Sequence, residues 1–372
     1  MRIFVLSNEF HPLIIGGLGI VATELTQRLV QDPANEVTVL TKGHKRFGQV
    51  KRHDNLKVVR FPRHSNYTSR THFFPEPILN WLREQGTSPP ELLHVHSVQC
   101  QELALLLQSN WNIPLVYSCH SLVRHERSSL ARDKMAKRQE LLFTFADRIT
   151  APSAWLQQEI GRPEKTTVIP NGVILPPETD RRRAPLDQLL FVGRLVRDKG
   201  IEELLHALAL LRQTEPRVRL TVVGGGAERY TLHLHSLCER LGVTGAVRWL
   251  GPRTHREVQR AYRTAGALVL PSRSESFGLV ALEALAAGIP LVSTQSGGLQ
   301  HSVNETTATL IPAVAPQTIA DAIRSMWQDP ERTAARREAG RKLAGEYDWT
   351  KIAFRYGALF QALIAERGSR NA

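Results

Sequence analysis

The stretch from Pro271 to Val292 constrains the fold of this chain more than any other, because it sets one charge inside an apolar run. It reads PSRSESFGLVALEALAAGIPLV, and Glu283 is the single carboxylate between Phe277 and Ala287. Burying an unpaired charge is expensive, so Glu283 is predicted to have a partner. The simplest structural alternative pairs Glu283 with an arginine and leaves Glu275 on a solvated loop.

Signals on both sides of this run predict a strand, a loop, a helix and a second strand. The segment 267–271 (ALVLP) is typical of a short buried strand, and Ser274 and Ser276 are N-cap candidates for the helix. Gly288 followed by Pro290 is expected to end it. Such a unit places the helix N-terminus at the carboxyl edge of a parallel sheet, where free backbone N–H groups favour phosphate.

Two carboxylates flank that phosphate-binding turn. Glu275 stands just before it, and Glu283, eight residues later, lies about 12 Å farther along the helical rise. Gly278 has no side chain, so a diphosphate could approach the first amides of the helix. A nucleotide sugar has a diphosphate between two hydroxyl-rich rings. One carboxylate could therefore accept from the sugar hydroxyls and the other from the ribose diol.

At these residues the chain resembles the retaining glycosyltransferases of family four, which include glycogen, sucrose and phosphatidylinositol mannoside glycosyltransferases. Their Glu-x7-Glu signature, with Phe-Gly two residues after the first Glu, is matched by Glu275, Phe277, Gly278 and Glu283. The resemblance implies a GT-B fold: two Rossmann-like, doubly wound, parallel-sheet α/β domains facing a cleft. It places the donor mainly on the second domain and the acceptor mainly on the first. The expected donor loop also contains Ser276 and Leu279.

The second domain begins with a predicted strand at 189–192, followed by a helix from about Ile201. Arg194 and Lys199 lie between them, at the carboxyl edge of the strand. Two cations there could neutralise a departing diphosphate. The family's Gly-Arg…Lys-Gly motif matches these residues, which implies that both contact the phosphates and act in catalysis. A solvated pair of surface charges is the alternative.

A glycine-rich loop follows the predicted N-terminal strand. Gly16 and Gly17 allow close backbone approach to a phosphate or a sugar, although a plain strand-to-helix turn would also account for them. The family carries a Gly-Gly loop here that faces the donor diphosphate, so both residues are predicted to bind the donor. Glycogen synthases have a lysine two residues before the pair, where this chain has Ile14, which argues against that activity.

Two further predicted strands, 92–99 and 113–122, each contain a histidine near their carboxyl ends, His96 and His120. Groups at such ends face the ligand crevice of a doubly wound fold. The family has a histidine by the reacting sugar and acceptor after the second of these strands. The resemblance therefore implies a catalytic role for His120 alongside Glu275. A structurally hydrogen-bonded histidine is the alternative for each, and the more natural one for His96.

The expected domains are residues 1–178, joined by a C-terminal helix at about 349–372, and residues 179–348, with a linker near Pro176 to Pro185. Pro252 and Arg253 are predicted to lie beside the nucleotide base. Farther along, the resemblance weakens. The aspartate after the family's Pro-Asn-Gly-Val turn is Ile174 here, the glutamate after its Gly-Gly pair is His301, and a later glycine is missing.

The composition indicates where in the cell the protein is expected to act. Three scattered cysteines among 372 residues offer neither a disulfide framework nor a metal-binding pair, which favours a reducing cytoplasm. No signal peptide or membrane span is indicated at the N-terminus. The formal net charge is +13, but the basic residues do not form a dense block. Scattered charges of this kind are typical of a solvated surface. A helix at 132–145, basic on one side and apolar on the other, could contact an anionic inner membrane face.

These observations predict a retaining, metal-independent glycosyltransferase without a cofactor. It is expected to move a hexose, of the glucose or N-acetylglucosamine type, from a nucleotide diphosphate sugar such as a UDP-sugar. The acceptor, whether small molecule, glycan or lipid, is not identified. A nucleotide-sugar 2-epimerase of the same architecture is the first alternative. A basic nucleic-acid-binding protein is the second, although the chain has no nucleic-acid-binding signature.

Overall fold

The protein is described by a computed structural model that covers residues 1–43, 49–62, 65, 66, 68, 72–125, 130–176 and 185–371. Its chain forms two compact units. Unit 1 contains Met1–Gly172 and Trp349–Ala372, and unit 2 contains Val173–Asp348. Most of the expected linker from Pro176 to Pro185 lies outside the described residues.

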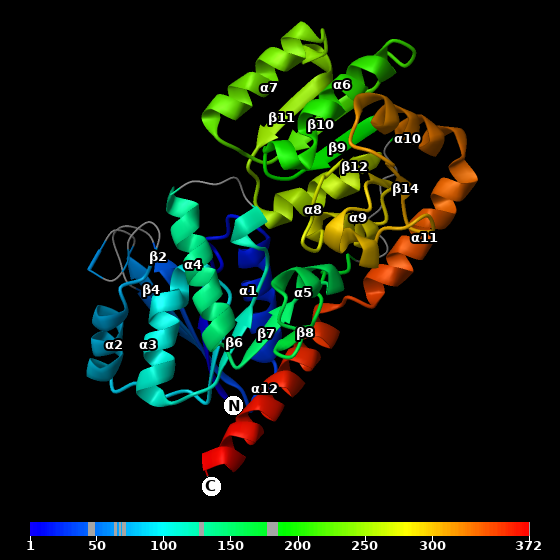
Figure 1. Cartoon of the computed structure of the whole chain (residues 1–372). Helices are drawn as coiled ribbons and strands as arrows, with labels where there is room; N and C mark the ends of the chain where they lie inside the picture. Colours follow the sequence, from blue (N-terminus) through cyan, green and yellow to red (C-terminus); the bar gives the residue numbers. More distant parts are fainter. Residues whose placement is uncertain are drawn as a thin grey trace. The chain divides into compact units, whose positions relative to one another are not determined.

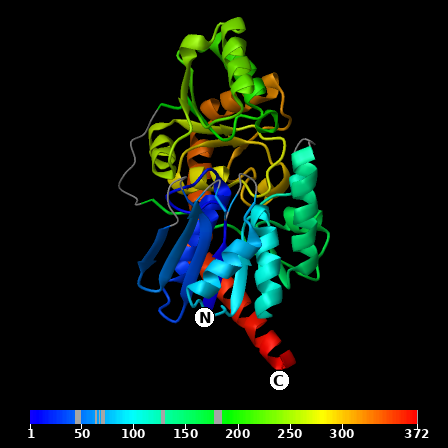
Figure 2. The same ribbon diagram turned by 90° about the vertical axis from the view of Figure 1, so that its left-hand side faces the viewer.

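Unit 1 is built on an eight-stranded sheet in the order β3-β4-β2-β1-β5-β6-β7-β8. All neighbouring strands are parallel except β3 and β4, which form the antiparallel edge. The blue strands of this edge are visible in Figure 2. The strands are β1 (Arg2–Leu6), β2 (Glu36–Gly43), β3 (Gln49–His53), β4 (Leu56–Pro62), β5 (Leu92–Val95), β6 (Leu115–Ser118), β7 (Arg148–Ala151) and β8 (Thr166–Val168).

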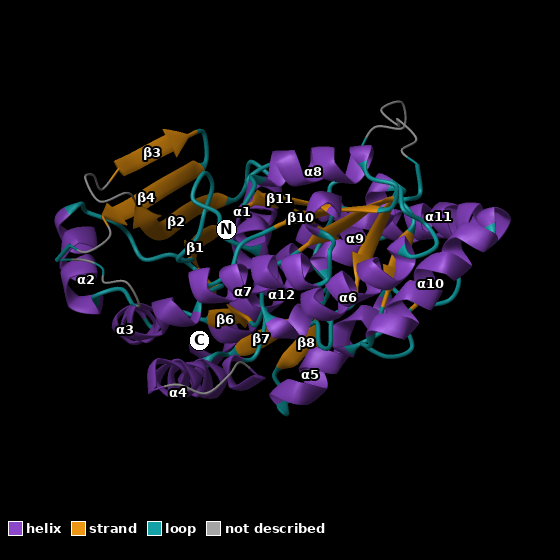
Figure 3. Cartoon of the chain, turned by 90° about the horizontal axis from the view of Figure 1, so that it is seen from above, coloured by secondary structure: helices purple, strands orange, loops and turns teal. Residues whose placement is uncertain are grey.

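Helices cover both faces of this sheet (Figure 3). The main apolar core lies on the face covered by α2 (Pro75–Glu84), α3 (Gln101–Trp111), α4 (Leu130–Phe145) and α5 (Ala154–Ile160). On the other face, α1 (Gly17–Leu29) packs beside α12 (Trp349–Asn371). Short 3₁₀ turns, η1 (Val98–Cys100) and η2 (Val123–His125), follow β5 and β6.

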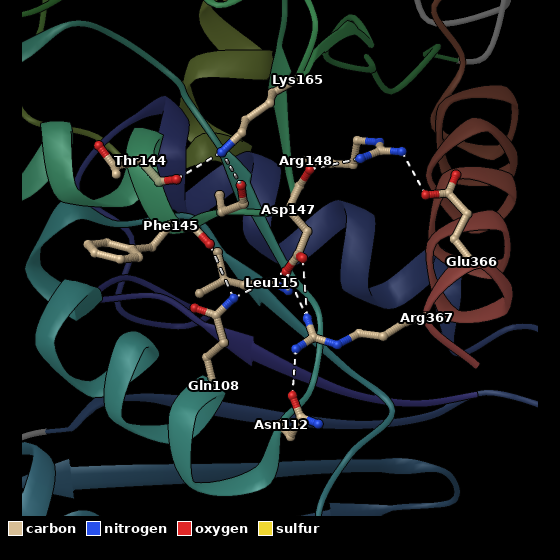
Figure 4. A network of polar contacts seen from close by, with 11 residues as sticks. Gln108, Asn112, Leu115, Thr144, Phe145, Asp147, Arg148, Lys165, Glu366 and Arg367 are labelled. Atoms are coloured by element: carbon tan, nitrogen blue, oxygen red, sulfur yellow. Dashed lines mark hydrogen bonds and ion pairs between the residues drawn. The ribbon is translucent and has the colours of Figure 1, made fainter. Parts of the chain in front are cut away.

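Helix α12 is bonded to the rest of unit 1 by a network of polar contacts at Asp147 (Figure 4). The Asp147 carboxylate accepts from the backbone N–H of Leu115 at 2.9 Å and from Gln108 Nε2 at 3.1 Å. Arg367 of α12 donates to the same carboxylate at 3.2 and 3.3 Å and to Asn112 Oδ1 at 2.7 Å. A tail distant in sequence is thereby joined to the loops that precede β6 and β7.

Unit 2 contains a fully parallel six-stranded sheet in the order β11-β10-β9-β12-β13-β14. Every strand is flanked by helices, as Figure 1 shows. The strands are β9 (Gln188–Val192), β10 (Arg219–Val223), β11 (Val247–Gly251), β12 (Ala267–Leu270), β13 (Leu291–Ser293) and β14 (Thr309–Leu310).

Two apolar cores hold the helices of unit 2 against its sheet. One lies under α6 (Ile201–Arg212), α7 (Glu228–Arg240) and α10 (Pro316–Gln328). The other lies under α8 (His255–Thr264), α9 (Leu279–Ala287) and α11 (Pro330–Gly345). The 3₁₀ turns are η3 (Arg197–Lys199), η4 (Thr244–Ala246) and η5 (Gly297–His301).

The strand order reverses beside the first strand of each unit. In unit 1, β2 and β5 lie on opposite sides of β1, and in unit 2, β10 and β12 lie on opposite sides of β9. In doubly wound folds, ligands bind outside the carboxyl ends of the strands at such a switch point. The expected doubly wound α/β architecture is thus confirmed in each unit.

Several details differ from the sequence predictions. Sequence reasoning did not identify β3 or α2. Both were missed because β3 carries charges on an edge strand and α2 is a short helix of 10 residues. The expected C-terminal helix is present as α12, which ends at Asn371. None of the helices formed by described residues combines the length and hydropathy needed to span a membrane.

Candidate functional site

Two loops meet at the switch point of unit 2. One follows β9 and carries Lys199, and the other follows β12 and carries Glu275. Lys199 Nζ lies 2.5 Å from Glu275 Oε1, and Ser272 Oγ donates to the same oxygen at 2.8 Å. The side chains of Lys199 and Glu275 are 15% and 14% exposed. The structure therefore brings together two residues that the sequence proposed for the site, and adds Ser272, which sequence reasoning missed.

Glycine permits this close approach of the two loops. Gly200 ends η3 in the left-handed region, with a φ of 66°. A Cβ added there would lie 2.2 Å from the carbonyl oxygen of Pro271. The N–H of Arg273 also donates to the carbonyl of Asp198 at 2.8 Å, and its guanidinium pairs with Glu203 at 2.6 Å. The hydrogen bond to Glu203 raises the pKa of Arg273 and helps to hold the loops together.

The Gly297-Gly298 pair packs behind the second loop. The N–H of Gly298 donates to the Glu275 carbonyl at 2.6 Å. A Cβ on Gly297 would lie 2.5 Å from that carbonyl oxygen, and one on Gly298 would lie 2.1 Å from the carbonyl of Ser276. The pair therefore supports the backbone of the loop, since any side chain would push it away.

Helix α9 begins later than predicted. Its N-cap is Gly278, with a φ of 88°, and neither Ser274 nor Ser276 caps it. No side chain caps the first turn of α9, which begins at Leu279. Phe277 is buried and stacks on His301, with ring centroids 4.3 Å apart. The positive φ required just before the helix explains why glycine, and not a serine, occupies the cap.

Glu283 has a partner, as predicted, but it is not an arginine. The Tyr262 hydroxyl of α8 donates to Glu283 Oε2 at 2.8 Å, and His255 Nδ1 lies 3.5 Å from Oε1. The residue is 5% exposed, and burial raises the pKa of its carboxyl to about 7 despite the hydrogen bond from Tyr262, which lowers it. Burial also lowers the pKa of His255.

Sequence reasoning missed both partners of Glu283. The signals lay in α8: Thr254 and Glu257 form a capping box that places His255 at the first helical position, and Tyr262 falls on the buried face two turns later. A buried tyrosine normally needs a hydrogen-bond acceptor.

Three of the expected donor residues of unit 2, Arg194, Pro252 and Arg253, are exposed, whereas Ser276 and Leu279 are half-buried. Arg194 follows β9 and makes no side-chain hydrogen bond or ion pair with any residue that the structure describes. Pro252 and Arg253 follow β11, which is separated from β9 by β10, and the Arg253 guanidinium lies 3.9 Å from Glu257. The structure leaves all three on the same carboxyl edge of the sheet as Lys199, without direct contact to it.

The glycine loop of unit 1 already contains a carboxylate. Glu9 Oε2 accepts from the backbone N–H groups of Ile15 and Gly16, at 2.8 and 3.0 Å. Gly16 is the N-cap of α1, and Gly17 is its first residue. A Cβ on Gly19 would lie 2.8 Å from Glu9 Oε2, so glycine is needed there as well. Of the two glycines predicted to bind the donor, Gly16 therefore has its amide bonded to Glu9, a contact that sequence reasoning missed.

His96 and His120 lie side by side after β5 and β6, neighbouring strands of unit 1. His96 Nδ1 is 3.1 Å from His120 Nε2. His96 is buried and His120 half-buried. Burial lowers the pKa of His120 to about 4 and that of His96 well below its usual value, so both rings are neutral near pH 7. Within the described ranges, no three His, Cys, Asp or Glu side chains are arranged to hold a metal ion.

Comparison with known proteins identifies the family. A model described as Glycosyltransferase Family 4 matches residues 15–175, and one described as Glycosyl transferases group 1 matches residues 180–343. A glycogen synthase of Mycobacterium tuberculosis is 30% identical over an alignment of 407 residues, which covers 100% of this chain and 96% of that protein. The chain is a family-four glycosyltransferase.

Other relatives of this glycosyltransferase differ in what their names say they act on. A D-inositol 3-phosphate glycosyltransferase of Corynebacterium jeikeium is 32% identical over 80% of this chain and 78% of its own. The solved structure of a sucrose-phosphate synthase from Thermosynechococcus elongatus matches with a TM-score of 0.82 and 24% identity, over 98% and 99% of the two chains. HepE of Anabaena, solved with UDP-glucose, matches with a TM-score of 0.75 and 20% identity, over 97% and 100%. These likenesses show the GT-B fold.

Proposed function

We propose that this glycosyltransferase moves a hexose, of the glucose or N-acetylglucosamine type, from a UDP-sugar to an acceptor hydroxyl with retention of configuration. The observation that carries the proposal is the contact between Lys199 and Glu275 at the switch point of unit 2, beside the uncapped first turn of α9. A cation, a carboxylate and free helix amides together match a diphosphate joined to a hydroxyl-rich ring.

The charged residues of the unit 2 site divide the work of binding the donor in this proposal. Lys199 and Arg194 neutralise the charge that develops on the leaving diphosphate, while the first amides of α9, from Leu279 on, bind its oxygens. Glu275 accepts from hydroxyls of the transferred sugar. Glu283 accepts from the ribose diol through Oε1, because Oε2 is bonded to Tyr262.

The remaining predicted donor residues form the walls of the donor site in this proposal. Ser276, Phe277 and Gly278 form the turn that the diphosphate approaches, and Pro252 and Arg253 border the base. Gly16 and Gly17 of unit 1 allow close approach of the backbone. Their loop is not assigned an anion-binding role, because Glu9 already accepts from two of its amides.

The choice of UDP and of a glucose-type sugar is supported by similar proteins. HepE of Anabaena is described in complex with UDP-glucose, and a pneumococcal O-GlcNAc transferase, at 17% identity, in complex with UDP and GlcNAc. The named acceptors of the relatives range from glycogen to an inositol phosphate. The acceptor of this chain is therefore proposed only as a hydroxyl.

The same charges support the proposal of retention and of metal independence. The donor phosphate, held by Lys199 and Arg194, can take the proton of the acceptor hydroxyl on the face where the leaving group departs. No protein nucleophile is then required. The two cations supply the charge that a metal ion supplies in other transferases. His120 of unit 1 orients the reacting oxygens.

The deciding experiment is a donor screen with purified protein. UDP-, ADP- and GDP-sugars are compared by thermal shift and by NMR of slow donor hydrolysis, which also reports the anomer formed. A UDP-sugar should give the largest shift and release a sugar of unchanged anomeric configuration, with EDTA having no effect. Release of the inverted anomer contradicts retention, and loss of turnover with EDTA that magnesium restores contradicts metal independence.

The same screen separates the alternatives. Conversion of a UDP-sugar alone into its C2 epimer would identify an epimerase. Binding to DNA or RNA that depends on salt and survives Lys199→Ala would support a nucleic-acid-binding protein.

A further inference from the structure

The two histidines at the carboxyl edge of unit 1 form an edge-to-edge pair. Their ring planes differ by 15°, and their centroids are 5.3 Å apart. With His96 Nδ1 only 3.1 Å from His120 Nε2, a proton on one nitrogen points at the lone pair of the other. Since both rings are neutral, one must donate and the other accept, and the remaining ring nitrogens decide which.

The free nitrogen of His96 is the decisive one. Its Nε2 is fully buried and has no hydrogen-bond partner in the part of the chain that the structure describes. The neighbouring His94 offers none, because its Nδ1 is also buried without a hydrogen bond to any described residue and its Nε2 is bonded to Ser118 Oγ at 2.8 Å. A proton on His96 Nε2 would therefore be an orphaned buried N–H, which folded proteins rarely tolerate. A bare lone pair there is the less costly arrangement.

The proton of His96 is accordingly assigned to Nδ1, which donates to His120 Nε2. His120 then accepts through Nε2 and carries its own proton on Nδ1. Nδ1 of His120 is not among the buried orphaned atoms and bonds to no described side chain, so it is available to a ligand.

We propose that His96 is a positioning residue that fixes His120 in the Nδ1–H tautomer, so that His120 presents a hydrogen-bond donor and not a base. The inference rests on the proposed function in assigning that donor to an oxygen of the reacting sugar or acceptor. It fits a reaction in which the donor phosphate takes the acceptor's proton, because His120 then has only to orient and polarise an oxygen. His96 becomes a functional residue without touching substrate.

The first test needs neither substrate nor activity. Protein labelled with ¹⁵N at its histidines is studied by long-range ¹H–¹⁵N correlation at pH 7, and the His120 signals are assigned by their loss in His120→Asn. Protonated and unprotonated imidazole nitrogens have well-separated ¹⁵N chemical shifts. The expected pattern is a protonated Nδ1 and a bare Nε2 for His120. The reverse pattern, or an average of the two, overturns the proposal.

The second test compares two replacements of His96. In His96→Asn, the side-chain amide nitrogen stands close to the position of Nδ1 and can still donate, so the His120 pattern and kcat should stay within about threefold of wild type. In His96→Leu, the donor is lost, and kcat should fall about tenfold or more while the donor KM stays within about twofold. A His96→Leu enzyme with wild-type kcat overturns the proposal.

A matched control is His94→Gln, which disturbs the same buried cluster but keeps an amide group that can hydrogen-bond to Ser118. It should leave the His120 pattern unchanged. If the donor screen finds no sugar transfer, the proposed function fails while the NMR result still decides the tautomer. If transfer is found and the His120 pattern is reversed, this inference fails alone.

Discussion

Lys199 Nζ and Glu275 Oε1 lie 2.5 Å apart although 76 residues separate them in the chain. Both side chains are largely buried, and they are neighbours because β9 and β12 are paired in the sheet. The contact joins the cation expected to meet a leaving phosphate to the carboxylate expected to meet the transferred sugar.

Lys199→Ala and Arg194→Ala should both lower kcat, by about 100-fold, because each removes a charge that stabilises the transition state. Their effects on stability should differ. Lys199→Ala leaves the buried Glu275 with Ser272 alone and should cost about 1–3 kcal/mol in the free energy of unfolding. Arg194 is exposed and unpaired among described residues, so its loss should cost under about 0.5 kcal/mol.

Urea unfolding and initial rates measure the two effects. Arg229→Ala removes another exposed arginine of unit 2 and should change neither. Equal stability losses in Lys199→Ala and Arg194→Ala would contradict the buried ion pair.

The stability of the protein should fall as the pH rises from about 4.5 to about 7, through Glu283. Its carboxyl has an ordinary pKa of 4.5 in the unfolded chain and a pKa of about 7 when folded. The folded state therefore holds a proton that the unfolded state has lost, and this contribution disappears above pH 7. Between pH 5 and pH 8 the change should be on the order of 2–3 kcal/mol.

Glu283→Gln should remove this dependence, and urea unfolding at several pH values measures it. In wild type, the hydrogen bond from Tyr262 lowers the pKa of Glu283. Tyr262→Phe removes this bond, so the pH range over which stability falls should extend to higher pH. A wild-type profile parallel to that of Glu283→Gln would exclude an elevated pKa.

Glu283→Ala should weaken nucleotide binding about ten- to a hundredfold, because a charge-assisted contact to the ribose is lost. Isothermal titration with UDP measures the dissociation constant. Leu232→Ala, which truncates an exposed apolar residue of the same unit, is the control. An unchanged dissociation constant in folded Glu283→Ala would remove this residue from the donor site.

Gly278→Ala should destabilise unit 2 by about 1–3 kcal/mol, since alanine would have to adopt a φ of 88° and its Cβ would lie 2.2 Å from Leu299 Cδ2. The displaced turn should also weaken donor binding. Thermal unfolding with and without UDP measures both effects. Gly345→Ala, where a Cβ meets nothing within 4 Å, should be neutral, and a neutral Gly278→Ala would contradict the strained cap.

Asp147→Ala should loosen α12 more than Glu366→Ala does. Asp147 accepts from a backbone amide, a glutamine and an arginine, whereas Glu366 makes one partly exposed pair, with Arg148, among the described residues. We expect a loss of about 1–3 kcal/mol for Asp147→Ala and under about 1 kcal/mol for Glu366→Ala. Hydrogen exchange in α12 reports the loosening, and equal exchange in both variants would argue against Asp147 as the anchor.

Much of the fold was determined by the sequence. Apolar strands, helices with buried residues at 3.6-residue spacing and glycine after helices are local signals, so β9, β12, α6 and the end of α9 at Gly288 were predicted from neighbouring residues alone. The sequence also predicted that Glu283 has a partner, because the apolar residues on both sides of it indicate burial, and an unpaired buried charge is costly.

The tertiary structure decided which side chains meet. Tyr262 for Glu283, Lys199 for Glu275 and His96 for His120 are contacts between segments that are neighbours in a sheet or that pack as helices. The cap of α9 was likewise decided by Leu299, whose side chain fills the space that a Cβ at position 278 would need. Periodicity and composition describe one segment at a time, whereas hydrogen bonds and excluded volume depend on which segments the fold brings within a few ångströms.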